Sequence, residues 1–125
     1  MLTPDLLLKA LVDETRLRCL LLVLAEQELC VCEFGHALAL VQPKISKHLA
    51  LLRTSHVLQD RKEGQWVYYR LHPALPAWAM EVMQAIAIGA EGLSPYREDL
   101  SRLQTMDNRP NVCQVGCKSR VNGAM

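Results

Sequence analysis

The sequence predicts a mainly α-helical domain that carries one β-hairpin. Apolar residues recur at helical spacing over most of the first 106 residues, two short runs rich in Val, Tyr and Trp flank Glu63-Gly64, and a helical pattern resumes after the second run. At 125 residues, half of them hydrophobic, the chain is long enough for one core. We therefore expect one domain over residues 1–106 and a flexible, cysteine-containing tail over residues 107–125, which has little to bury.

The first two helices are expected over residues 4–11 and 14–27. Pro4 suits a first helical turn, where a backbone N–H would have no partner in the helix. Asp13 is a suitable N-cap for the second helix. The second half of that helix is apolar on most sides, which predicts a central place in the core, with Cys19 as a small buried side chain.

Two further helices are expected over residues 28–40 and from residue 42 to about residue 55, with a short break between them. In the later helix Ile45, Leu49 and Leu52 form one apolar stripe, and the cationic residues lie off it. Taken alone, this segment also fits the solvated face of an ordinary helix. A tight connection into such a helix is nevertheless typical of a helix-turn-helix, whose second helix reads DNA. The residues expected to contact DNA from this helix are Gln42, Lys44, Ser46, Lys47 and His48.

Residues 57–62 and 65–71 are expected to form the β-hairpin. A hairpin that follows a helix-turn-helix is a wing, and the cations at this tip are suited to phosphates beside the groove. Alternate residues of the second strand, Tyr69 among them, are expected to pack, whereas Tyr68 faces the other way and either packing or DNA contact is open to it. The wing residues expected to contact DNA are Arg61, Lys62, Gln65, Tyr68 and Arg70.

The charge distribution supports this location of a DNA-binding surface. The whole chain has a formal net charge of only +1, but residues 1–40 contain three basic and six acidic residues, whereas residues 41–72 contain six basic and two acidic ones. A local positive potential of this kind is expected of a small DNA-binding module.

Two helices are expected after the wing, over residues 77–90 and 96–106. The first carries Trp78, Val82 and Ile86 on an apolar stripe and needs a partner to cover it. Together with the leucine-rich first helix it is the best candidate for a homodimer surface, although burial in the protein's own core would explain the same pattern.

The cysteine count and the N-terminus favour a reducing compartment. Five cysteines is an odd number, and Asp5 lies where a signal peptide would be basic or apolar. The apolar run over residues 19–25 is too short to span a bilayer. We therefore expect a cytoplasmic protein with free thiols and no membrane partner.

Four segments in this order resemble the ArsR/SmtB family of winged helix-turn-helix repressors. They are residues 12–18 (VDETRLR), 28–33 (ELCVCE), 42–49 (QPKISKHL) and 60–71 (DRKEGQWVYYRL). The resemblance implies a homodimer that binds a palindromic operator in double-stranded DNA, represses transcription of an arsenic-resistance operon, and leaves the DNA when it binds a metalloid or metal. It implies a regulator without enzymatic activity and without a cofactor for folding.

Within this resemblance, Cys30 and Cys32 match the thiolate pair of the arsenite-sensing branch, which implies As(III) or Sb(III) as the inducer. Soft thiolates suit such thiophilic centres, and a helix N-terminus is expected to favour the thiolate. Residues two apart on a regular helix point to nearly opposite sides, so both sulfurs reach one ion only if the first helical turn unwinds or is irregular. Distortion there would disturb the helix pair that fits the DNA.

The chain departs from the family pattern at the third ligand. Gly35 stands where some arsenite sensors have a third cysteine, so a third sulfur would come from Cys113 or Cys117, from the partner chain or from a small thiol. No cysteine precedes Cys19, unlike in the Cd/Pb-sensing branch, and residues 77–90 contain no His, unlike in the zinc-sensing branch.

Three alternatives stay open at this point. The same scaffold could sense another thiophilic metal or thiol redox state. A thiol-dependent arsenate reductase is suggested by Cys113 and Arg120, but their spacing is wrong for an anion loop and no strand leads into it. A protein-interaction adaptor built on a winged helix would lack salt-dependent DNA affinity.

Overall fold

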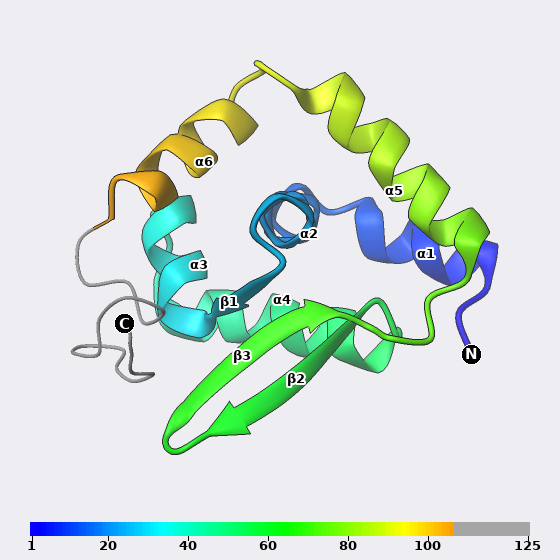
Figure 1. Ribbon diagram of the computed structural model, residues 1–125, viewed down its shortest axis with the longest axis horizontal. Coiled ribbons are helices and arrows are strands. Elements are labelled where there is room, and N and C mark those ends of the chain that lie inside the picture. The colour runs from blue at the N-terminus through cyan, green and yellow to red at the C-terminus, as the bar shows by residue number, and fades with distance from the viewer. Residues whose placement is uncertain (107–125) are drawn as a thin grey trace.

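The computed structural model describes residues 1–106, which form six helices and a three-stranded antiparallel sheet (Figure 1). The mainly α-helical fold with a hairpin wing is therefore confirmed. No helix in this described part has the length and apolar character needed to cross a bilayer. The elements are α1 (Pro4–Leu11), α2 (Glu14–Glu26), β1 (Glu28–Cys30), α3 (Val31–Leu38), α4 (Gln42–Thr54), β2 (Leu58–Glu63), β3 (Trp66–Leu71), α5 (Ala77–Ala90) and α6 (Tyr96–Gln104).

Helix α2 runs through the centre of the molecule, with the other helices and the sheet around it (Figure 1). It begins as expected, because the Asp13 side chain accepts a hydrogen bond from the Arg16 backbone N–H at 3.1 Å. It ends at Gln27, whose φ of 78° turns the chain out of the helix. Cys19 and Leu20 are fully buried, which confirms the central position of this helix.

The expected helix over residues 28–40 is wrong in its first three residues. These form β1, which pairs antiparallel with β3 so that Leu29 lies opposite Tyr69 and Cys30 opposite Tyr68. The sheet order is β1-β3-β2, so the wing hairpin is extended by a third strand from before the helix pair. A three-residue strand is too short to show an alternating pattern, and its partner lies about 40 residues away in sequence, beyond the reach of local signals.

Helices α3 and α4 form the expected helix-turn-helix. Ala39 adopts the left-handed conformation with φ 58°, and Leu40 donates its backbone N–H to the Gly35 carbonyl at 3.1 Å, so the turn is tight. A side chain at Gly35 would place its Cβ 3.3 Å from the Leu40 oxygen, which explains a glycine at this close approach. The apolar stripe expected for α4 is confirmed, since its three members are completely buried: Ile45, Leu49 and Leu52.

The wing consists of six residue pairs between β2 and β3, from Leu58 opposite Leu71 to Glu63 opposite Trp66. The strands match the expected ranges to within one residue. The two-residue loop between them begins at Gly64, whose φ of 62° is a conformation that glycine adopts without strain.

Helix α6 is held to α2 and α3 by a buried ion pair. The Asp99 carboxylate is 1% exposed and accepts two hydrogen bonds from Arg18, at 2.8 and 2.6 Å. Arg102 also donates to Asp99 at 3.0 Å and to the Ala37 carbonyl at 2.7 Å, which satisfies an acceptor near the end of α3. The Asp99 carboxylate raises the pKa of the Arg18 guanidinium.

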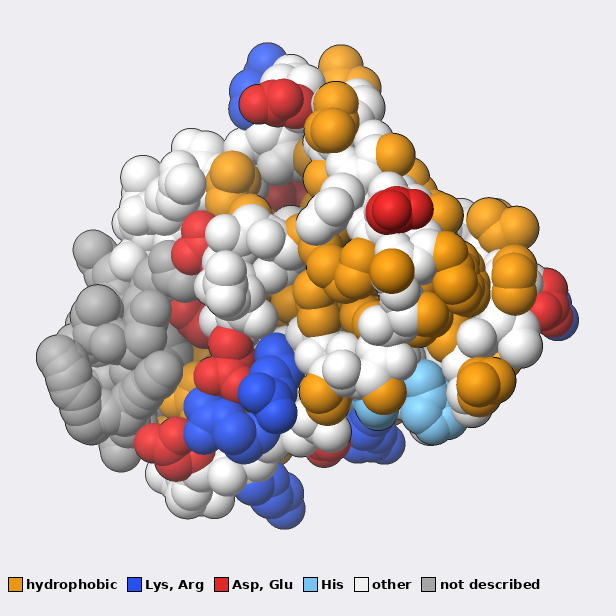
Figure 2. Space-filling view, turned by 45° about the vertical axis from the view of Figure 1, so that its right-hand side comes forward, with side chains coloured by type: hydrophobic (Ala, Val, Ile, Leu, Met, Phe, Trp, Pro, Cys, Tyr) orange, Lys and Arg blue, Asp and Glu red, His pale blue; other side chains and the backbone are white. Residues whose placement is uncertain are grey.

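An apolar face remains uncovered on α1 and α5. Figure 2 shows hydrophobic side chains gathered on this side of the molecule, and the side chains of Leu8, Val82 and Ile88 are exposed by 65, 37 and 74%. Ile88 also lines a cavity of about 790 Å³ between α2, α5 and α6. The sequence-based expectation of an apolar end helix that lacks a complete cover within its own chain is thus consistent with the structure.

Candidate functional site

Cys30 and Cys32 bring their sulfur atoms together at the start of α3. Cys30 is the N-cap residue with extended backbone angles of φ −88° and ψ 165°, so it lies outside the regular helix, whereas Cys32 is in the first turn. The two Sγ atoms are 2.8 Å apart. Of the two arrangements that would let both sulfurs reach one ion, the structure shows the irregular start, and no unwinding of α3 is needed.

The buried carboxylate of Glu33 fixes the position of Cys30. Its Oε1 accepts the backbone N–H of Cys30 at 2.8 Å, and the Cys30 sulfur accepts the backbone N–H of Glu33 in return. This is the reciprocal arrangement of a capping box, with a thiol in place of the usual hydroxyl. Sequence reasoning missed Glu33, although the acidic residue three positions after an N-cap was a signal that could have found it.

The environment of Cys30 disfavours its thiolate. Burial, followed by the neighbouring negative charge of Glu33, raises the pKa of the Cys30 thiol to about 12, and backbone donors at the helix start lower it by less. The expectation that the helix N-terminus would favour a thiolate is therefore wrong for Cys30. The raised pKa of Cys30 favours its protonated thiol at neutral pH.

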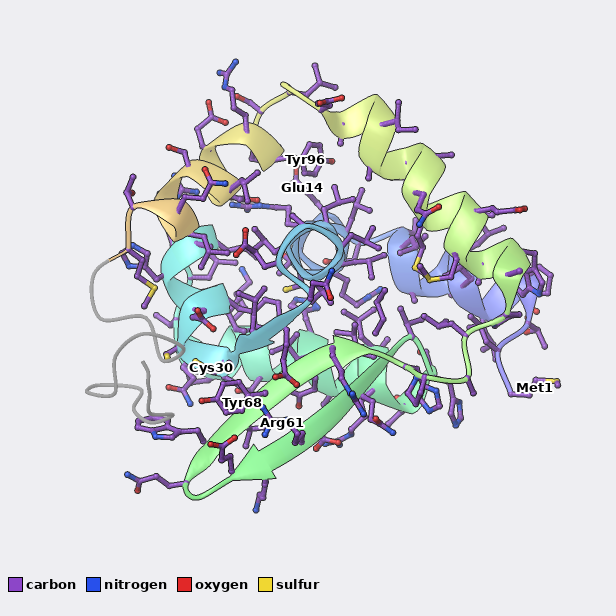
Figure 3. The ribbon with its side chains drawn as sticks, in the orientation of Figure 1. Met1, Glu14, Cys30, Arg61, Tyr68 and Tyr96 are labelled. Atoms are coloured by element: carbon purple, nitrogen blue, oxygen red, sulfur yellow. The ribbon has the colours of Figure 1, made fainter. Side chains whose placement is uncertain are left out.

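Tyr68 belongs to the thiol site and not to the surface. It is 2% exposed and packs with Cys30, Cys32 and Trp66 (Figure 3). The open choice between packing and DNA contact is thereby decided for packing, because a side chain this buried cannot reach a phosphate. Its burial depends on β1, which covers the face of β3 that the sequence alone leaves open.

Arg61 is also unsuited to the DNA contact expected of it. Its Nε and Nη2 donate to the two carboxylate oxygens of Glu28 at 3.1 and 2.7 Å, and its Nη1 donates to Glu63 at 2.6 Å. The guanidinium lies over the Tyr68 ring, 4.7 Å from its centroid. These carboxylates raise the pKa of Arg61, and their negative charges offset that of the guanidinium, so the expected DNA contact of Arg61 is not supported.

Helix α4 presents most of its expected DNA-contacting residues to solvent. Gln42, Lys44 and Lys47 are exposed and Ser46 is half-buried. His48 is the exception: its side chain is 14% exposed and its Nδ1 lies 3.9 Å from an Asp13 carboxylate oxygen and 3.4 Å from an Arg16 nitrogen. The expected DNA contact of His48 is therefore not supported, because its ring lies against the start of α2.

On the wing, Lys62, Gln65 and Arg70 are exposed. Arg70 donates to the Gln59 side chain at 2.9 Å, which leaves its remaining N–H groups toward solvent. These three residues stay in the expected DNA-contacting set.

A third ligand does not lie in the described part of the chain. Within residues 1–106 no three His, Cys, Asp or Glu side chains gather closely enough to hold a metal ion. Cys113 and Cys117, the expected candidates, lie outside the described residues. The soft donors available here are the two converging sulfurs, which fit a thiophilic centre.

Stability should decrease above about pH 9 because two thiols are buried in their neutral form. Burial raises the pKa of Cys19 to about 12, as it does for Cys30. Between about pH 9 and 12 the thiol is ionised only in the unfolded chain, so each such thiol lowers the free energy of unfolding by about 1.4 kcal/mol per pH unit. Urea unfolding at pH 8, 9 and 10 should show a shallower pH dependence for Cys19→Ala than for the wild type. Identical slopes would contradict the assignment.

The sequence is similar to those of known bacterial regulators. Residues 13–57 match the family described as "Bacterial regulatory protein, arsR family". The "Arsenic resistance transcriptional regulator ArsR1" of Pseudomonas putida is 52% identical over 87% of this chain and 84% of that protein. The "Arsenical resistance operon repressor" of Escherichia coli is 46% identical over 90% of this chain and 97% of its own length.

Two solved structures are similar in fold. HlyU from Vibrio cholerae is 35% identical and has a TM-score of 0.59 over 66% of this chain and 85% of its own. The structure described as the AntR antimony-specific transcriptional repressor has a TM-score of 0.60 over 70% of this chain and 76% of its own, at 23% identity. At 23% identity the second of these structures supports the fold alone.

Proposed function

Because this chain belongs to the arsR family of bacterial regulatory proteins, we propose that it is a metalloid-responsive transcriptional repressor of an arsenic-resistance operon. It binds operator DNA in the cytoplasm and leaves it when As(III) or Sb(III) binds Cys30 and Cys32. The observation that carries this proposal is the 2.8 Å separation of the two sulfurs at the start of α3, the helix that supports α4.

Protonated thiols are compatible with this chemistry. When a thiol binds arsenous acid, an As–S bond forms and an As–O bond breaks, and the thiol proton leaves with the hydroxide as water. Two thiols thus replace two hydroxides without a free thiolate at neutral pH. The raised pKa of Cys30 is therefore no obstacle to binding at equilibrium, because the thiols, the arsenous acid and the complex they form are all neutral.

The proposed DNA surface combines α4 and the wing. Gln42, Lys44, Ser46 and Lys47 would enter the major groove, and Lys62, Gln65 and Arg70 would contact the flanking backbone. Two such surfaces are needed for a palindromic operator. We propose that the uncovered apolar face on α1 and α5 forms the homodimer interface that provides them (Figure 2).

Release follows from the shared start of α3. Binding of a metalloid at Cys30 and Cys32 would shift the N-terminal end of α3, and the tight turn at Ala39 and Leu40 transmits that shift to α4. The coupling free energy needed between the metalloid site and the DNA surface is modest, because about 1–3 kcal/mol lowers operator affinity by about 5- to 150-fold.

Operator binding measured by fluorescence anisotropy tests the proposal, with DNA from upstream of the protein's own gene and titrations of As(III), Sb(III), Zn(II) and Cd(II). We expect As(III) and Sb(III) to release the wild type and to leave Cys30→Ser/Cys32→Ser bound. Cys19→Ala, which removes a thiol from a different buried cluster, is the matched control and should be released normally.

Other outcomes would assign the trigger differently. Release by Zn(II) or Cd(II) but not by As(III), or release by an oxidant alone, would replace the metalloid with another thiophilic metal or with thiol redox state. Binding that does not weaken as salt rises would contradict the DNA surface. The reductase alternative is set aside, because the relatives are transcriptional regulators and not enzymes.

A further inference from the structure

Arg61 joins three parts of the molecule that the proposed function has to connect. Its guanidinium binds Glu28 on β1 through two hydrogen bonds, at 3.1 and 2.7 Å. It binds Glu63, at the tip end of β2, at 2.6 Å. It also covers the Tyr68 ring on β3 at 4.7 Å (Figure 3). One side chain therefore touches all three strands of the sheet.

The thiol site lies directly beneath this contact. Tyr68 is paired with Cys30 across β1 and β3, and both are almost completely buried, at 2 and 1% exposure. Glu28 is two residues before Cys30 on the same strand, so the two side chains share a face of the sheet. Arg61 is thus linked to the strand that carries Cys30 by its ion pair with Glu28 and by its contact with Tyr68.

The site is closely packed around the sulfurs. Cys30 and Tyr68 are buried in one cluster, so a metalloid bound to the Cys30 sulfur would press against the Tyr68 side chain. Displacement of the Tyr68 ring would break the cation–π contact between this ring and the Arg61 guanidinium. The guanidinium has a second partner in Glu63, so it can give up Glu28 without losing all of its paired charge.

Resting on the proposed function, we propose that Tyr68 and Arg61 transmit inducer binding from the thiol pair to the wing. In the DNA-binding state Arg61 is paired with Glu28 and holds the hairpin against β1. With As(III) or Sb(III) bound, Tyr68 shifts, the pair between Arg61 and Glu28 opens, and the wing moves relative to α4. Arg61 is a positioning residue in this scheme and contacts neither the DNA nor the metalloid.

The test separates inducer binding from the response to it. As(III) affinity is measured by calorimetry on the full chain, and operator affinity by anisotropy with and without saturating As(III). Arg61→Gln and Glu28→Gln should have As(III) dissociation constants within about threefold of that of the wild type. The operator dissociation constant with As(III), divided by that without it, should be at least about fivefold smaller in these variants than in the wild type. The double variant should lose no more of this ratio than either single variant, since both break one interaction.

Arg70→Gln is the matched control on the neighbouring strand. It should weaken operator binding equally with and without As(III), so its ratio should equal that of the wild type. A wild-type ratio in both Arg61→Gln and Glu28→Gln would overturn the inference, and so would loss of As(III) binding in both. A wild type that As(III) does not release would instead refute the proposed function, and this inference with it.

Discussion

Asp99→Ala is expected to lower the free energy of unfolding by about 3–5 kcal/mol, the usual cost of removing one partner of a buried ion pair. The substitution leaves the Arg18 guanidinium, which is only 13% exposed, without the carboxylate that accepts two of its hydrogen bonds. It also removes the hydrogen bond within α6 between Asp99 and Arg102, the residue that donates to the Ala37 carbonyl of α3. Urea unfolding followed by circular dichroism measures the loss, and a domain of this size is expected to be partly unfolded at 37 °C.

The neighbouring residue provides a control for this prediction. Glu98 also pairs with an arginine, Arg97, but at the surface, so Glu98→Ala should change the unfolding midpoint little. Arg18→Met/Asp99→Leu, which removes both charges and keeps the volume, should be more stable than Asp99→Ala. The prediction would be contradicted if Asp99→Ala lost only a small part of the free energy of unfolding. It would also be contradicted if Arg18→Met/Asp99→Leu were less stable than Asp99→Ala.

Local signals in the sequence were sufficient for most of the fold. Pro4 lies in the first turn of α1, Asp13 caps α2, and Gly64 lies in the wing loop, as expected from residue types whose backbone or capping preferences act within a few positions. The buried stripe of α4 followed from spacing alone. These are features for which the chemistry is contained in a short window of sequence.

The errors arose where the outcome depends on residues far away in the chain. Strand β1 exists because β3 offers it a partner, and no local pattern over Glu28–Cys30 reports that partner. His48 turns toward Asp13 and Arg61 toward Glu28, contacts that join residues more than 30 positions apart. A cation in a sequence is available to DNA only if no carboxylate from elsewhere in the fold reaches it first, and that condition is visible only in three dimensions.

The candidate site shows the same division. The resemblance to the arsenite-sensing branch pointed to Cys30 and Cys32 as a thiol pair, and the capping position of Cys30 explains how the sulfurs converge. The burial of Cys30, which raises the pKa of its thiol, could not be predicted from the sequence, because it depends on packing with Tyr68 and Glu33. The assigned DNA-contacting set was likewise reduced only by contacts between elements.

Lys44→Gln/Lys47→Gln is expected to weaken operator binding by about 10²- to 10³-fold at 0.15 M salt, provided that each lysine neutralises one phosphate in each half of the dimer. Both side chains are exposed on α4, off its buried stripe, so the substitutions remove charge without opening the core. Four phosphate contacts account for a change of up to about 3.6 in the slope of log K against log salt. Anisotropy titrations between about 50 and 300 mM KCl measure that slope directly.

A charge-matched control decides whether this loss comes from the proposed surface. As the match for Lys47→Gln alone, Arg97→Gln removes one exposed cation per chain, on α6, which lies across the molecule from the wing (Figure 1). It should keep most of the affinity and the salt slope, because charges farther than about a Debye length of 8 Å from the DNA are largely screened. Gln42→Ala should instead change the preference among operator sequences and leave the slope unaltered, since an amide reads base edges and neutralises no phosphate. Equal losses in Lys47→Gln and Arg97→Gln would mean that net charge, and not the position of α4, determines binding.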